Sequence, residues 1–333
     1  MSDMIDEPQV ASSVRDSETV RDRVADWILL EGDRRAVAGC LVVLIIVLVW
    51  TLINANVLAV GPNSSVSTVF GSGLTSGIVT LLTVALSINQ LVLSRVFGSV
   101  DVLTERLNGS RELRQTVESI AGVPSSPNDP AEFLSLIAMT ITDRAEGIVA
   151  VSDGTDWDPP TKLTDSLRDL AAYGENLDSN LESKAQLSAL ISTLLGTEYA
   201  ENMTAVRYLQ NEYAESIPED VAGEFQAIET LLESIAVVRQ FYKTITIQED
   251  LATLSRQLVY SGITALMATF IVALMYLTSS VTLPILVLPV VVSIGIGIII
   301  APLALFVSYI LRAATVARKT VSVGPFIPPN NGE

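Results

Sequence analysis

The sequence predicts an all-α membrane protein with two transmembrane helical hairpins, which make four spans, and a helical cytoplasmic domain inserted between them. Two stretches, Ala36–Ser94 and Gln257–Leu311, contain no Asp, Glu, Lys or Arg, although the 333-residue chain has a formal charge of −17. Each stretch exceeds the about 20 residues that cross a bilayer and is interrupted near its middle by polar residues or proline, which is typical of two helices joined by a turn. The acidic segment between them shows helical patterns throughout.

The expected boundaries follow the distribution of charge. In order, they are a cytoplasmic N-terminal tail or amphipathic helix at 1–35, a first hairpin at 36–94 with helices at about 36–60 and 72–93, an acidic helical cytoplasmic domain at 95–257, a second hairpin at 258–311 with helices at about 258–278 and 283–311, and a cytoplasmic tail at 312–333. Before the first span, Val20, Val24 and Trp27 share one face of a short helix. That face is typical of a segment lying on a membrane surface.

Basic residues near the expected helix ends all fall on one side of the membrane. They are Arg34 and Arg35 before the first span, Arg95 after the second, Arg256 before the third, and Arg312, Arg318 and Lys319 after the fourth. Positive residues beside a span favour the cytoplasmic side. We therefore expect a multi-pass cell-membrane protein with both termini and the central domain in the cytoplasm.

A helix start is marked within the central domain. At Asp129-Pro130-Ala131-Glu132, a capping carboxylate precedes proline at the first helical position and glutamate at the third. The helix that begins there is expected to bury Phe133, Ile137, Ile141 and Ile148. This motif places one core-facing helix in the first half of the domain.

Two further runs of apolar residues recur at three- and four-residue steps. One consists of Leu163, Leu167, Leu170, Leu177 and Leu181, and the other of Val221, Phe225, Ile228, Leu232, Ile235 and Val238. Ordinary core packing is favoured over an oligomeric coiled coil, because neither run sustains four heptads. No helix breaker lies between Glu219 and the third span, so one long helix is expected to enter the membrane.

The second expected span has a stripe of polar residues. Steps of three and four residues place the following six on one helix face: Ser72, Ser76, Thr80, Thr83, Ser87 and Gln90. In hydrocarbon such a stripe lies against another helix or against water. Helix packing is the favoured interpretation, supported by the GxxxG pair Gly73 and Gly77, and a pore lining is the alternative.

The fourth expected span has a stripe of small residues and prolines. It comprises Pro289, Ser293, Gly297, Ala301, Ala304 and Ser308. Small side chains let helix backbones approach closely, so Ser293, Gly297 and Ala301 are expected to contact a neighbouring helix. Gating flexibility at the prolines is the weaker alternative.

The composition argues against several classes of function. Histidine is absent, so the commonest metal ligand and neutral-pH acid or base are missing, and no serine or cysteine nucleophile has a partner base. No ionisable side chain lies inside the uncharged stretches, which argues against proton pumps and voltage sensors. The carboxylates at 153–158 lack EF-hand spacing and are interpreted as a solvated turn. We expect no enzyme activity, no metal, no cofactor and no binding of nucleic acid.

The run from Ser76 to Arg95, SGIVTLLTVALSINQLVLSR, followed by Phe97-Gly98-Ser99, resembles a family of uncharacterised haloarchaeal membrane proteins. The resemblance extends through the acidic segment to the C-terminal hairpin and implies a cell-membrane protein of a halophile. Few lysines beside many acidic residues are typical of such proteins, because molar salt screens acidic repulsion. In topology alone the chain is also similar to bestrophin-type anion channels.

Two functions are consistent with these features. The favoured hypothesis is a non-enzymatic, oligomeric membrane scaffold or sensor whose cytoplasmic helical domain binds a protein partner. The alternative is an ion channel lined by the polar face of the second span. Besides the lipid bilayer, the expected partners are further copies of the chain and a cytoplasmic protein.

Overall fold

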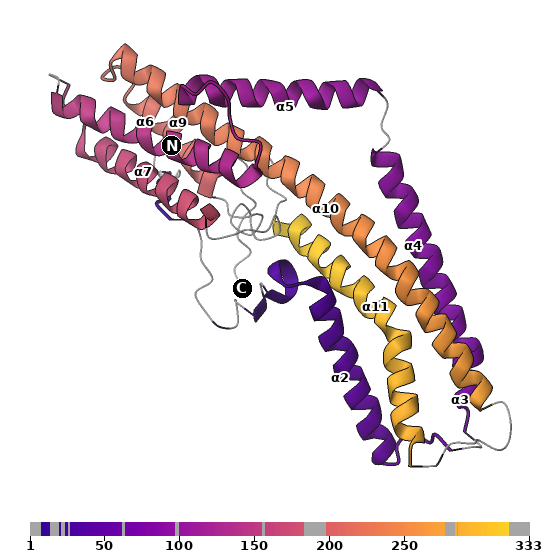
Figure 1. Ribbon diagram of the computed structural model, residues 1–333. Helices are drawn as coiled ribbons and strands as arrows, with labels where there is room; N and C mark the ends of the chain where they lie inside the picture. The colour runs from indigo at the N-terminus through magenta and orange to yellow at the C-terminus, as the bar shows by residue number, and fades with distance from the viewer. Residues whose placement is uncertain are drawn as a thin grey trace, which may run out of the picture. The chain divides into compact units, whose positions relative to one another are not determined.

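The computed structural model describes residues 8–13, 20, 24–25, 27–61, 64–96, 100–154, 157–182, 198–276, 284 and 286–319. Within these residues every regular element is a helix (Figure 1). The chain forms two compact units. Unit 1 comprises Met1–Arg23, Ser99–Thr246 and Val316–Glu333, and unit 2 comprises Val24–Gly98 and Ile247–Thr315.

Unit 2 holds the apolar helices. Its elements are the π-helix η1 (Trp27–Glu31), α2 (Arg34–Asn54), α3 (Val66–Thr68), the π-helix η2 (Val69–Leu74), α4 (Thr75–Val96), the second part of α10 (Glu219–Met275) and most of α11 (Leu288–Lys319). Among the described residues, four helical segments are long and apolar enough to cross a membrane: Arg34–Asn54, Val66–Leu91, Glu219–Met275 and Leu288–Val316. These four segments indicate a membrane protein.

The spans differ from their expected limits at several ends. Helix α2 stops at Asn54, before the expected Val60, because Asn56 adopts a left-handed conformation with φ 58°. Asparagine tolerates that conformation, and the Val57 N–H bonds back to Leu52 O at 3.0 Å, which closes the helix end. The second span begins earlier than residue 72, at Val66, and the fourth begins later than residue 283, at Leu288.

The continuity of the long helix predicted from Glu219 onward is confirmed: α10 runs for 57 residues without interruption and includes the segment expected as the third span. Its first part belongs to unit 1 and its second part to unit 2. The segment contains no proline, and its glycines, Gly223 and Gly262, occur singly, which explains its continuity. One element thus supplies core residues to both units.

In unit 2, α11 lies between α2 and α10, and α4 lies on the other side of α10 (Figure 1). The contact of α11 with α2 is close at Gly297, where a Cβ would overlap with the Ile46 side chain. Helix α10 meets α4 at Gly262, where a Cβ would lie 2.6 Å from Leu82 Cδ2. At these two positions only glycine leaves room for the side chain of the neighbouring helix.

Unit 1 is a helical bundle around one apolar core. Within the described residues its helices are α5 (Val100–Ala121), α6 (Pro130–Gly154), α7 (Thr161–Glu182), α9 (Glu198–Glu212) and the first part of α10. Phe133, Ile137, Ile141 and Ile148 are at most 5% exposed, as predicted. Both apolar runs expected on α7 and α10 enter this same core, which is the arrangement that ordinary core packing requires.

The predicted helix start at Asp129 is confirmed. Helix α6 begins at Pro130, and Asp129 Oδ1 accepts hydrogen bonds from the N–H groups of Ala131 at 2.9 Å and Glu132 at 3.2 Å. Just before it, Glu118 Oε1 accepts from Ser126 N at 2.8 Å and Ser126 Oγ at 2.7 Å. These two bonds favour the carboxylate form and lower the pKa of Glu118. They connect the end of α5 to the loop before α6.

Gly174 of α7 packs closely against the backbone of α6. A Cβ there would lie 2.6 Å from Ala138 O and would overlap with Thr142 Oγ1, both on α6. Gly174→Ala is expected to lower the free energy of unfolding by about 2 kcal/mol, because the obstructing atom is backbone. Gly147→Ala on α6 is the matched control: nothing lies within 4 Å of its Cβ, and alanine improves helix propensity. Thermal unfolding of both variants measures the difference, and equal stability of the two would contradict the prediction.

Candidate functional site

Ionisable side chains come together at the end of unit 2 where α2 begins. Arg312 of α11 pairs with Asp250 of α10, with 3.4 Å between Nη1 and Oδ1, and their side chains are 9% and 17% exposed. Arg34, the first residue of α2, is 2% exposed and interacts electrostatically with both partners of this pair. Two arginines and one carboxylate are thus held largely away from solvent.

Arg34 is also held by the backbone of η1. Its guanidinium donates from Nη1 to Ile28 O at 2.8 Å, from Nε to Gly32 O at 2.9 Å, and from Nη2 to Trp27 O at 3.4 Å. These carbonyls lie at or near the π-helix, and Trp27 O also accepts from Gly32 N at 2.8 Å. The Arg34 carbonyl in turn accepts from Ser308 Oγ of α11 at 3.1 Å. Arg34 therefore ties the segment before the first span to α2 and α11.

Helix α10 makes a polar contact with each of the other three helices at this end. Besides Asp250, Gln257 contributes an amide oxygen that, in the orientation that satisfies its neighbours, accepts from Arg35 Nε at 2.9 Å and Tyr309 OH at 3.2 Å. Ser255 Oγ donates to Ala85 O of α4 at 3.1 Å. We call this set the polar cluster: Arg34, Arg35, Asp250, Ser255, Gln257, Ser308, Tyr309 and Arg312.

Sequence reasoning missed Asp250, because it assigned this residue to the acidic central segment. The available signal was its position on α10, four residues before Leu254 and eight before Leu258, both of which are buried. A carboxylate at that spacing shares the buried face of the helix. The polar cluster itself contains no group arranged as a nucleophile with a base, so its chemistry is that of an ion-paired joint between helices.

The structure exposes every residue of the predicted polar stripe on the second span. Ser72, Ser76, Thr80, Thr83, Ser87 and Gln90 all lie on the surface of the single chain, and the buried face of this segment is the opposite one, with Ile78 and Ala85. At about 100° per residue, the two sets point in opposite directions. We call the six residues the hydroxyl stripe. Within the described residues, all six stay exposed and the buried face of this segment packs on the other helices.

Four hydroxyls of the stripe bond to the preceding helical turn. Ser72 donates to Thr68 O at 2.7 Å, Thr80 to Ser76 O at 2.9 Å, Thr83 to Val79 O at 3.0 Å and Ser87 to Thr83 O at 3.1 Å. Such bonds satisfy the hydroxyl proton and leave oxygen lone pairs outward. The stripe therefore presents acceptors to whatever covers this face.

The predicted helix-packing residues fall into two groups. On α11, Ser293 is 1% exposed and Ala301 is half-buried, and Gly297 contacts α2 through Ile46. On the second span, Gly73 and Gly77 have no atom within 4 Å of a Cβ built on them. The first group is used inside the chain, whereas the GxxxG pair lies open beside the hydroxyl stripe.

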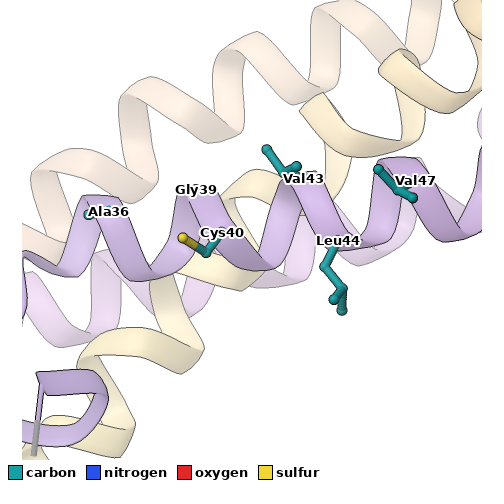
Figure 2. A pocket seen from close by; sticks show the side chains of 6 residues that line it. All are labelled: Ala36, Gly39, Cys40, Val43, Leu44 and Val47. Carbon is teal, nitrogen blue, oxygen red and sulfur yellow. The ribbon is translucent and has the colours of Figure 1, made fainter. Parts of the chain in front are cut away.

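A shallow groove of about 630 Å³ runs along the outer face of α2 (Figure 2). Figure 2 shows the residues that line it, which are Ala36, Gly39, Cys40, Val43, Leu44 and Val47. Apart from the Cys40 thiol, these side chains offer no hydrogen-bonding group. An apolar, open face of this kind suits lipid chains and not a polar substrate.

Unit 1 offers a second hollow of about 370 Å³ between α6 and α7, lined by residues that include Glu146, Leu167, Arg168 and Glu175. Arg144 of α6 forms an ion pair with Glu224 of α10, with 2.8 Å between Nη1 and Oε2. In the core of unit 1, Tyr173 is only 3% exposed, and this burial raises the pKa of its hydroxyl. Within the described residues, no group of three or more Cys, Asp or Glu is placed to hold a metal ion.

A model of a protein family matches residues 2–332, and its description is "Family of unknown function (DUF7972)". The match covers both units and every residue of the polar cluster and the hydroxyl stripe. No curated protein and no solved structure matches the chain.

Proposed function

Because the chain belongs to the DUF7972 family, which has no assigned activity, its function has to be inferred from its own residues, and we propose that it is a non-enzymatic membrane scaffold or sensor that works as a homo-oligomer. Copies join along the face of the second span that carries the hydroxyl stripe. Unit 1 lies in the cytoplasm and binds a protein partner.

The observation that carries this proposal is the outward direction of the hydroxyl stripe. Its six residues are exposed, and Gly73 and Gly77 beside them leave room for a close neighbour. In a bilayer, hydroxyl acceptors and small residues gain more from a second helix than from lipid chains. Among the described residues of unit 2 this face is exposed, so in the proposed oligomer a further copy supplies the second helix.

The topology proposed for this oligomer is two transmembrane hairpins with unit 1 between them. Support comes from the basic residues beside the spans, including Arg34, Arg35, Arg256 and Arg312. The uncharged turns then face outward. The excess of acidic residues supports a salt-adapted, haloarchaeal cell as the source, since high salt screens their repulsion.

The role as a sensor draws its support from α10. This helix contributes Phe225 and Ile228 to the core of unit 1, and Leu254 and Leu258 to that of unit 2. A continuous helix resists bending more than a loop does, so binding to unit 1 is transmitted to the spans through it. Asp250 and Gln257 stand where such a displacement changes the polar contacts between helices.

A channel is the second candidate, and the same stripe favours it. In a ring of copies, the outward hydroxyl acceptors of Thr80 and Thr83 line a central pore instead of a helix contact. Two hairpins around a helical cytoplasmic domain are also the topology of bestrophin-type channels, which is an analogy of fold alone. Thr80→Leu and Thr83→Leu then reduce conductance of the reconstituted protein, whereas a scaffold conducts no ions in either form.

Oligomeric mass tests the contact along the second span. We expect the purified full-length protein in lipid nanodiscs to be larger than one copy, and Gly77→Leu to weaken association at least about fivefold, because a side chain enters the closest contact. Gly39→Leu on the outer face of α2 is the matched control, since its Cβ position is also open. A wild-type monomer, or equal loss of association in both variants, would contradict the proposal.

A further inference from the structure

Helix α5 divides into a part that packs on unit 1 and a part that does not. In its second half, Val117 is fully buried, and Leu113 packs against the same core. Arg114 donates from Nη2 to Ser126 O at 2.5 Å and lies over the Phe133 ring. In its first half, all residues from 101 to 109 are exposed. The core of unit 1 therefore supports only the end of this helix.

The exposed half of α5 nevertheless has an apolar seam of its own. Leu103 and Leu107, which are 48% and 60% exposed, are four residues apart and lie on one side of this half of the helix. Two large leucines on an exposed seam are unusual for a helix whose only neighbour is water. They indicate a further surface that covers this half of α5.

The charges of α5 are separated around this seam. Arg106 and Arg111 flank Leu103 and Leu107, whereas the acidic residues Asp101, Glu105 and Glu112 lie on the opposite face. At about 100° per residue, the acidic residues gather within about 40° of arc, roughly opposite the leucines. Leucines bordered by arginines, with carboxylates on the other face, are typical of a helix that lies in an anionic membrane interface.

We propose that the first half of α5 docks on the anionic surface of the bilayer that α4 crosses, with Leu103 and Leu107 entering the interface and Arg106 and Arg111 binding lipid phosphates. Only three residues separate the end of α4 at Val96 from the start of α5 at Val100. That linker spans at most about 14 Å, counting four peptide steps, so the chain keeps the start of α5 near the end of the span.

The same charges argue against a second copy of α5 as the occupant and fix which face meets the membrane. A second copy of α5 would bring arginines of both copies to one contact, where like charges repel. The strongly acidic chain, at −17, is repelled from an anionic surface elsewhere, so the acidic face of α5 points away from the membrane. This inference rests on α4 crossing the membrane and not on the oligomer.

Site-directed spin labelling of the full-length protein in vesicles tests the docking. In a Cys40→Ser background, which removes the single cysteine, labels are attached at Leu103→Cys and Leu107→Cys, with Glu105→Cys and Glu112→Cys as controls from the opposite face. In vesicles containing phosphatidylglycerol, we expect the two leucine positions to be accessible to oxygen and protected from a water-soluble nickel complex. The control positions are expected to be accessible to nickel.

Lipid charge and the two arginines distinguish docking on a membrane from contact with a second copy of the chain. Arg106→Gln with Arg111→Gln is expected to weaken docking about 30-fold, at about 1 kcal/mol for each charge, and pure phosphatidylcholine to weaken it similarly. Nickel access at all four positions in anionic vesicles would overturn the proposal. Labels at positions 103 and 107 could also be protected from nickel equally in both lipids and show spin coupling between copies. That result would overturn the proposal in favour of contact with a second copy.

Discussion

Asp250→Ala is expected to lower the free energy of unfolding of unit 2 by about 3 kcal/mol, because it leaves Arg312 without its carboxylate partner in a largely buried position. The Arg312 side chain is only 9% exposed, so water cannot replace that partner. Arg34, which interacts with the same carboxylate, is 2% exposed. Two arginines then repel each other inside the polar cluster. A fall in melting temperature of about 5 °C or more in detergent is the expected result.

The matched control is an ion pair on the surface of unit 1. Asp165 and Arg168 are 3.2 Å apart, with side chains 60% and 64% exposed, so Asp165→Ala is expected to change stability by at most about 0.5 kcal/mol. Replacing both Asp250 and Arg312 by leucine removes the unpaired charge and is expected to recover part of the lost stability. If the Asp250→Ala variant has the same melting temperature as the Asp165→Ala control, the polar cluster does not hold the helices together.

Gly297→Val is expected to have the second large effect, at about 3 kcal/mol, because α11 and α2 would be forced apart. Even the Cβ of such a side chain overlaps with Ile46 and lies 3.5 Å from Val42 Cγ1. Overpacking of a closely packed contact is costly, since neither helix can move without losing other contacts. The melting temperature of the full-length protein in detergent measures the loss.

A second substitution separates this steric effect from a general effect of valine. Ile46→Ala in the Gly297→Val background opens the space that the new side chain needs, and we expect it to restore part of the stability. Gly39→Val on α2 places the same residue where a Cβ meets no atom within 4 Å, so little change is expected. A Gly297→Val protein as stable as Gly39→Val would mean that α2 and α11 are not in close contact.

Local patterns predicted several features correctly. The start of α6 followed from Asp129 and Pro130, because a capping carboxylate and an N-terminal proline act within one turn. The continuity of α10 followed from the lack of breakers after Glu219. Burial of Ile137 and Leu167 followed from helical periodicity. In each case, residues close in sequence carry the physical cause.

Other features required the tertiary structure. The end of α2 depends on the left-handed Asn56, which was not anticipated within an apolar run. Asp250 was counted with the solvated acidic residues, yet its partner Arg312 is 62 residues away in sequence. Gly77 and Gly297 both occur in small-residue patterns, and only the structure shows that one is open and the other is packed on α2.

By itself, the sequence determined that this protein has four apolar helical segments able to cross a membrane and an acidic helical domain, because hydropathy, charge and helical period are properties of neighbouring residues. Only the tertiary structure decided that α11 lies between α2 and α10, that Asp250 pairs with Arg312, and that the hydroxyl stripe faces away from the other helices. These features depend on which helix faces meet. That choice is made by close packing and by pairing of buried charges between residues far apart in the chain.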